Sequence, residues 1–108
     1  MKVKNYLCEN EKIKLKKVIY KITYSNRKIY IGKDLTNTLT YFGSVKSDYV
    51  AKDFTEKEMK DFTIRKEIIF ESDTTEEINC IESKLILEKE SNNPKIGYNQ
   101  WPKFKENK

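Results

Sequence analysis

The chain has 108 residues, a length that allows one compact domain and leaves little room for a second. Charged residues make up 36% and hydrophobic residues 37%, so the core must be small, yet an aromatic fraction of 12% is too high for a disordered chain. The net charge of +5 is a weak sign of a polyanionic partner, because AT-rich coding would also give many lysines. No apolar run is long enough for a membrane span or a secretory signal, which predicts a soluble, cytoplasmic protein with no membrane partner.

The chain contains no histidine and only two cysteines, Cys8 and Cys80. This composition excludes zinc fingers, Ser-His-Asp triads and Cys-His nucleophile pairs together. Because a cytosolic setting keeps thiols reduced, we expect both cysteines to be free thiols with a structural function rather than a disulfide.

The first third of the chain predicts an arm followed by a β-hairpin. Residues 1–16 carry no clear hydrophobic period and are treated as an N-terminal arm. From there to Tyr24 apolar and β-branched residues alternate, which predicts a strand. Residues 25–28 supply turn chemistry, and a second apolar run, 29–31, is stopped by Gly32. The two runs therefore predict the strands of a hairpin.

The middle of the chain predicts a loop, a short helix and a third strand. Residues 33–41 are rich in Thr, Asn and Asp and favour a loop. Ser44 is then placed to cap a short helix with one apolar face, formed by Tyr49, Val50 and Phe54. Residues 55–61 are rich in charged side chains, and we expect them to form a connecting segment. The run 63–70 predicts a strand whose second half is apolar on both sides, as in a buried central strand.

A longer helix is predicted from the pair Thr74 and Glu77, which has the spacing of a capping box. The helix is expected to run to about Ser91, since the sequence Asn92-Asn93-Pro94 breaks it. The residues expected to pack inward are Ile78, Ile81 and Leu85, with Cys80 and Leu87. Together the elements predict an α+β domain over residues 17–100, with a three-stranded antiparallel sheet flanked by helices and a basic tail over residues 101–108.

Two tripeptides on the predicted hairpin, Val18-Ile19-Tyr20 and Tyr30-Ile31-Gly32, resemble the paired motifs that name the GIY-YIG nucleases. Val18 replaces the glycine of the first motif. Glu82 on the predicted helix is similar to the metal-binding glutamate of that family, and Gly97-Tyr98-Asn99 resembles the Tyr-Asn pair that follows it. The resemblance spans residues 17–100 and implies a GIY-YIG-like fold and a metal-dependent DNA endonuclease.

One branch of the family is the closer match. Lys33, the stretch Tyr41-Phe42-Gly43-Ser44 and Lys46 resemble phage and intron-associated proteins of the homing-endonuclease kind, with Val45 in place of a glycine. DNA is the implied partner, and a homodimer is left open. The family's helix arginine has no counterpart here, because no arginine lies between Arg27 and Arg65.

The implied chemistry assigns a role to six residues. Glu82 would hold one Mg²⁺ or Mn²⁺ while leaving most of the coordination sphere to water and phosphate. Tyr20 and Tyr30 would position water or the scissile phosphate if they pair across the hairpin. Without histidine, the general base would be a tyrosine with a lowered pKa or metal hydroxide. We expect Lys46 to offset transition-state charge and Lys33 to bind phosphate in the ground state. The sixth candidate catalytic residue is Asn99, from the pair that resembles the family's Tyr-Asn.

Each of these residues also has a purely structural interpretation. Tyr20 and Tyr30 could be ordinary cross-strand aromatic packing, Glu82 a solvated helix residue, and the two lysines plain surface. For Asn99, tying the tail to the sheet edge is as well supported as a catalytic role. The competing function is a catalytically degenerate protein that holds nucleic acid or a protein partner, and the missing arginine and Val18 favour it.

Overall fold

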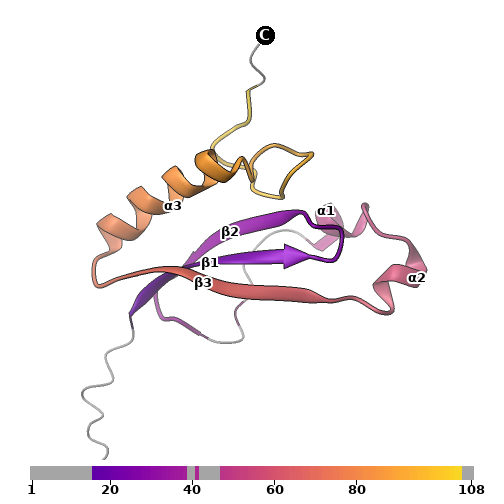
Figure 1. Cartoon of the computed structure of the whole chain (residues 1–108), viewed down its shortest axis with the longest axis horizontal. Helices are drawn as coiled ribbons and strands as arrows, with labels where there is room; N and C mark the ends of the chain where they lie inside the picture. Colours follow the sequence, from indigo (N-terminus) through magenta and orange to yellow (C-terminus); the bar gives the residue numbers. More distant parts are fainter. Residues whose placement is uncertain (1–15, 39–40, 42–46, 106–108) are drawn as a thin grey trace, which may run out of the picture.

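The computed structural model describes residues 16–38, 41 and 47–105. The first two elements along the chain are the strands β1 (Lys17–Tyr24) and β2 (Ile29–Asp34). Two short helices follow, α1 (Ser47–Ala51) and α2 (Glu56–Met59), and the last elements are β3 (Ile64–Ser72) and α3 (Thr75–Lys89) (Figure 1). The predicted α+β class and three-stranded antiparallel sheet are confirmed. Residues 1–15 of the expected arm, with Cys8, the Ser44 cap and Lys46, lie outside the described residues.

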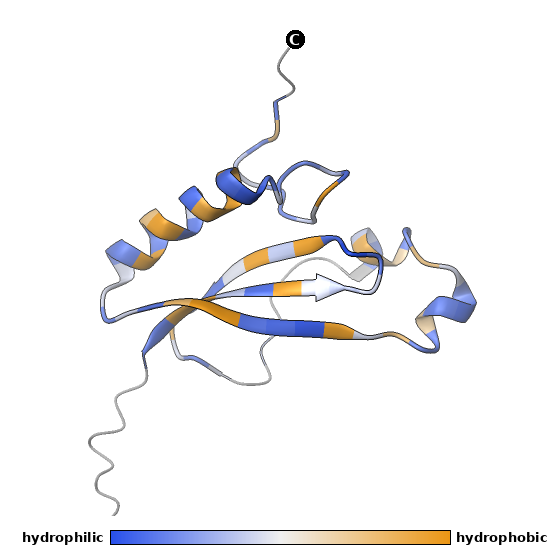
Figure 2. Cartoon of the chain, viewed as in Figure 1, coloured by the Kyte–Doolittle hydropathy of each residue, from blue (hydrophilic) through white to orange (hydrophobic). Residues whose placement is uncertain are grey.

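The strand order is β2-β1-β3, so β1 is the central strand. Its side chains alternate between two apolar clusters, one on each face of the sheet. One cluster is built around Ile19, Ile31, Ile78 and Ile86, and brings α3 onto the sheet. The other contains Tyr20, Ile22, Tyr24, Val50 and Tyr98. Figure 2 shows the apolar residues concentrated on the strands and along α3, with α2 hydrophilic.

The hairpin forms as predicted, although β2 is longer than expected. Arg27 takes a left-handed conformation with φ of 76° in the turn, and Asn26 Oδ1 accepts a hydrogen bond from the Lys28 N–H at 3.0 Å. The strand does not stop at Gly32 but continues to Asp34. Gly32 is a ladder residue opposite Tyr20, and a Cβ there would meet Tyr20 Cζ at 2.5 Å. The glycine therefore makes room for the tyrosine and does not end the strand.

The prediction that the third strand is central is wrong, because β3 pairs only with β1 among the described strands. That prediction rested on the apolar run 68–70. The β1–β3 register shifts between Ile19 and Tyr20, which face Phe70 and Ile68 respectively, so Ile69 is an extra residue in β3. This bulge lets Ile69 and Phe70 both pack against the α3 cluster, while Ile68 is 42% exposed.

The short helices differ from the prediction in two ways. Phe54 lies beyond the end of α1, although it still packs against the same cluster as Tyr49 and Val50. The charged segment 55–61 contains α2, which sequence analysis missed. Its start carries a capping box, because Thr55 Oγ1 accepts from the Glu58 N–H at 3.1 Å and Glu58 Oε1 accepts from the Thr55 N–H at 2.8 Å.

The long helix α3 begins where the sequence predicted, with Thr74 as N-cap accepting from the Glu77 N–H at 3.2 Å. The Glu77 carboxylate accepts from the Ser72 hydroxyl at 2.6 Å, which ties the helix start to the end of β3. Two inward predictions are wrong, since Cys80 is an exposed free thiol and Leu87 is 56% exposed. No helix in the described part of the chain is long and apolar enough to cross a membrane.

After α3 the chain turns back and runs along the outer edge of β2 (Figure 1). The N–H of Ile29 donates to the Ile96 carbonyl at 3.1 Å, and the N–H of Tyr98 donates to the Ile29 carbonyl at 2.9 Å. Ile29 and Gly97 thus form a parallel bridge. The segment 96–99, called the edge segment below, pairs with a strand edge that would otherwise present unpaired backbone groups.

Gly97→Ala should destabilise the fold by about 3 kcal/mol, near the upper end for overpacking, because its Cβ would meet the Ile29 carbonyl oxygen at 2.6 Å and Ser91 Cα at 2.7 Å. Both neighbours are backbone, so the edge segment must move. Urea unfolding measures the change, and Lys95→Ala in the same turn is the matched control, expected within about 0.5 kcal/mol of the parent. Equal stability of the two variants would contradict the close packing described here.

Candidate functional site

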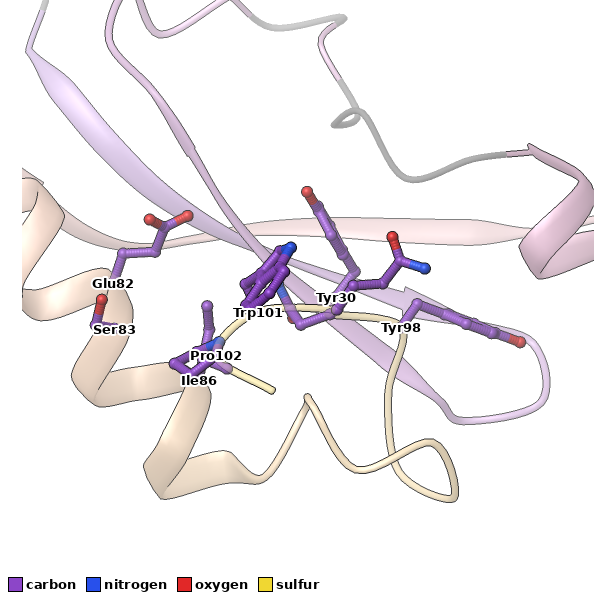
Figure 3. Close-up of a pocket in the computed structure, with 9 residues that line it drawn as sticks. Tyr30, Glu82, Ser83, Ile86, Tyr98, Trp101 and Pro102 are labelled. Atoms are coloured by element: carbon purple, nitrogen blue, oxygen red, sulfur yellow. The ribbon is translucent and has the colours of Figure 1, made fainter. Parts of the chain in front are cut away.

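A cavity of about 390 Å³ lies between α3, β2 and the chain that follows α3. It is lined by Tyr30, Glu82, Ser83, Ile86, Tyr98, Asn99, Gln100, Trp101 and Pro102. Figure 3 shows Glu82 and Ser83 entering from α3, Tyr30 from β2, and Trp101 from the chain beyond the edge segment. Three predicted site residues, Tyr30, Glu82 and Asn99, are therefore brought to one cavity from distant parts of the sequence.

The two motif tyrosines share a face of the hairpin, as predicted, but they are not direct partners. Tyr20 stands opposite Gly32, and Tyr30 stands opposite Ile22. The tyrosine rings meet diagonally, with centroids 6.4 Å apart. Tyr20 is only 1% exposed, whereas Tyr30 is partly exposed and lines the cavity. The pair therefore has an inner and an outer member.

The prediction of a tyrosine with a lowered pKa is wrong for Tyr20. Burial raises the pKa of its hydroxyl well above the ordinary value, and the neighbouring Tyr30, Tyr41, Asp34 and Glu82 push it in the same direction. The hydroxyl of Tyr20 is thus held in its protonated form. A protonated hydroxyl is suited to donating a hydrogen bond and is unsuited to act as a base.

Glu82 lies on the side of α3 that faces the cavity and is half-buried. Burial raises the pKa of its carboxyl, and Lys33 acts in the opposite direction. The Lys33 ammonium donates to Asn79 Oδ1, which holds the lysine beside α3. The net rise in pKa means that the nearby positive charge does not fully compensate the buried carboxylate, so an added cation would be favourable there.

A lysine that sequence analysis passed over, Lys66 of β3, lies against the inner tyrosine. Its ammonium is 5.0 Å from the centroid of the Tyr20 ring and donates to the carbonyls of Thr38, at 3.0 Å, and Tyr41, at 2.7 Å. In sequence it is one lysine among many, inside the hydrophilic middle of β3 (Figure 2). Knowledge of the β1–β3 register would have placed this lysine near Tyr20, because Lys66 pairs with Ile22, two residues along the strand from Tyr20.

Thr38 and Tyr41, which accept from this lysine, also line a second cavity of about 320 Å³. Its other lining residues are Lys33, Asp34, Leu35 and Thr36. The Asp34 carboxylate is already occupied. It accepts from the N–H and hydroxyl of Thr36, each at 3.0 Å, and from the N–H of Thr38 at 2.6 Å. Burial opposes ionisation of Asp34, but these hydrogen bonds outweigh it and lower the pKa. Asp34 therefore organises the loop.

Asn99 ties the chain to the sheet edge, as one of its two interpretations proposed. Its Oδ1 accepts from the Ile31 N–H and its Nδ2 donates to the Ile31 carbonyl, both at 2.8 Å and buried. The amide thereby takes the place of a strand residue beside β2. Because both ends of the amide are used in this way, the structure gives Asn99 a positioning role at the cavity wall.

Tyr98, next to Asn99, fixes the edge segment to the hairpin turn. Its hydroxyl donates to Asp53 Oδ2 at 2.7 Å and accepts from Asn26 Nδ2 at 2.9 Å, and Lys28 binds the same Asp53 oxygen at 2.8 Å. Burial raises the pKa of Tyr98 to about 12, while the lysine and the phenol lower the pKa of Asp53. Figure 3 shows the hydroxyl directed away from the cavity, so this tyrosine is structural.

Glu82 is the one carboxylate among the residues that line the larger cavity. Within the described residues there is no group of three or more Cys, Asp or Glu side chains that could hold a metal ion. A divalent ion at Glu82 would therefore keep mostly water and phosphate ligands, which is how Mg²⁺ is commonly bound. A half-buried carboxylate with an incompletely compensated charge fits such an ion.

Comparison of the chain with protein-family models, with curated proteins and with solved structures found no match.

Asn99→Ala should destabilise the fold by about 2–5 kcal/mol, because it leaves the buried N–H and carbonyl of Ile31 without their partners. Asn99→Asp should keep the bond to the N–H but set a carboxylate oxygen against the carbonyl. Its stability should therefore recover as pH falls and the carboxyl becomes a donor. Urea unfolding at several pH values tests both, with the exposed Gln100→Ala as control. Asn99→Ala as stable as that control would refute the positioning role.

Proposed function

We propose that this chain is a divalent-metal-dependent DNA endonuclease of the GIY-YIG type. The observation that carries the proposal is the meeting of Glu82, from α3, with Tyr30, from the second motif, at one cavity beside the Tyr20 ring. The two tripeptides also lie in register across β1 and β2, with Gly32 opposite Tyr20. A phage or mobile-element origin, as in the branch that the sequence resembles, remains part of the proposal.

In this proposal the metal, when bound, would polarise the scissile phosphate and lower the pKa of an attacking water. Glu82 would hold the ion. Tyr20 would remain protonated, because its pKa is raised, and would act indirectly, by packing against Tyr30 and holding that ring at the cavity. Tyr30, the partly exposed member, is the tyrosine that can touch substrate directly.

The positive charge that offsets the transition state would come from lysine, since the family's helix arginine is absent. Lys46, favoured by the sequence, lies outside the described residues. Lys33 enters from the α3 side, where it acts on the Glu82 carboxyl. Lys66 enters from the β3 side and contacts the Tyr20 ring. We therefore add Lys66 to the two lysines already proposed as sources of that charge.

The second candidate function is a degenerate GIY-YIG-like protein that binds nucleic acid or a protein partner. Two observations favour it: the rise in the pKa of Tyr20 removes one candidate base, and no arginine lies between Arg27 and Arg65. A degenerate DNA-binding chain would bind DNA with an affinity that falls steeply with salt but would leave it intact. A protein-binding chain would show neither property.

Glu82→Gln should lower Mg²⁺-dependent nicking of supercoiled plasmid at least about 100-fold, because several kcal/mol of transition-state stabilisation would depend on the metal. DNA affinity and the urea midpoint should change little. The matched control is Glu76→Gln in the exposed first turn of the same helix, which should nick like the parent. If the parent binds DNA but never nicks it with Mg²⁺ or Mn²⁺, the degenerate alternative is correct. Nicking by Glu82→Gln at the parent rate would remove the metal assignment.

Single-turnover cleavage at saturating DNA should separate the three lysines. The transition-state cation, when changed to Ala, should slow cleavage by about 10²–10³ with little loss of affinity, whereas a ground-state phosphate contact should show the reverse. We expect Lys46 or Lys66 to show the first pattern and Lys33 the second. Lys66→Arg should restore rate if charge is what matters, and Lys57→Ala on α2 is the control. Parent rates for all three alanine variants would exclude lysine from the transition state.

A further inference from the structure

Trp101 is the single tryptophan of the chain and is 69% exposed, although it lines the larger cavity. The chain next to it is held in place, because Asn92 Nδ2 donates to the Pro102 carbonyl at 2.7 Å and Asn99 is bonded to β2. An exposed indole contributes little to the fold, and the catalytic proposal above does not use it. A large aromatic side chain displayed in this way on a tethered segment is suited to binding.

The surroundings of Trp101 narrow the class of ligand. In Figure 3 the indole stands between Glu82 and Tyr30, and the amide of Gln100 and the hydroxyl of Ser83 line the same cavity. The ammonium of Lys103 lies 6.0 Å from the centroid of the indole ring. The site therefore combines an aromatic face, hydrogen-bonding side chains and a flanking positive charge.

We infer that Trp101 is a stacking platform for one unpaired nucleobase, next to the phosphate that the Glu82 site would hold. A base offers a π-face to the indole and polar edges to the cavity, and its own phosphate offers an anion to Lys103. Within a duplex both faces of a base are covered by its neighbours, so only an unpaired base presents a face to the indole. This inference rests on the proposed function and assigns its substrate class, DNA with at least one unpaired base at the cut site.

Because Trp101 is the only tryptophan, its intrinsic fluorescence reports this site alone. The full chain, without metal and with EDTA so that no cleavage occurs, is titrated with single-stranded oligothymidylate. An abasic oligonucleotide of equal length and a duplex closed at both ends by non-nucleotide linkers, which has no unpaired base, serve as comparisons. We expect the oligothymidylate to quench the fluorescence and the two comparisons to leave it nearly unchanged. Equal quenching by the abasic strand, or by the closed duplex, would overturn the inference.

Three variants test the contact by the anisotropy of a labelled oligothymidylate. Trp101→Ala should weaken binding by about 5- to 150-fold, the range for loss of one base–aromatic stack, and Trp101→Phe should restore most of the affinity. The control is Phe104→Ala, an exposed aromatic of the same tail that does not line the cavity, which should bind like the parent. The salt dependence should be the same in all variants, because no phosphate contact is lost.

These results separate the inference from the proposed function. A parent that nicks plasmid, while Trp101→Ala binds single strands as tightly as the parent does, would overturn the stacking inference alone. A parent that shows base-dependent quenching, but cuts neither supercoiled plasmid nor a duplex with one unpaired base, would retain the stacking site and overturn the nuclease proposal. Circular dichroism of Trp101→Ala should match the parent, since the removed side chain is mostly outside the core.

Discussion

Two buried hydrogen bonds between the Asn99 amide and the backbone of Ile31 hold the edge segment against β2. This attachment satisfies strand groups that would otherwise be buried without partners. It also sets where the next residues lie, because Gln100, Trp101 and Pro102 complete the cavity wall opposite α3. Without it, Glu82 and Tyr30 would face open solvent and not a shared cavity.

The close approach at Gly32 has a similar effect inside the sheet. Its missing side chain leaves space for the Tyr20 ring, which lies buried beneath the outer tyrosine. The same burial that stabilises Tyr20 raises the pKa of its hydroxyl. Packing thus decides the chemistry, since the inner tyrosine becomes a donor and only the outer one is in contact with the cavity.

Much of the fold could be predicted from the sequence because its signals are local. The alternation in β1, the turn at Asn26 and the Thr74 cap depend on neighbouring residues, and all three were found in place. The central position of β1 could not be predicted, because the bulge at Ile69 puts two consecutive apolar residues on one face of an edge strand. In α3, burial follows the stripe of Ile78 and Ile86 and leaves Leu87 outside.

The candidate site was predicted less completely, for a related reason. Tyr30, Glu82 and Asn99 belong to motifs, and motifs are visible in sequence. Lys66 and Trp101 belong to none, and only the β1–β3 register and the path of the edge segment bring them to the tyrosines and the cavity. For Asn99, sequence left a structural and a catalytic role equally supported, and its two bonds to the Ile31 backbone supply the structural one.

The proposed chemistry depends most on a divalent ion binding at Glu82, in the cavity that Trp101 also lines. Paramagnetic broadening by Mn²⁺ in the ¹⁵N spectrum of the intact chain tests this without DNA or cleavage. We expect the first signals to broaden to be the amides around Glu82 and the indole N–H of Trp101, and we expect Glu82→Gln to abolish the effect at the same Mn²⁺ concentration. Early broadening around Glu88 and Glu90, at the C-terminal end of α3, with the cavity unaffected would contradict metal binding at Glu82.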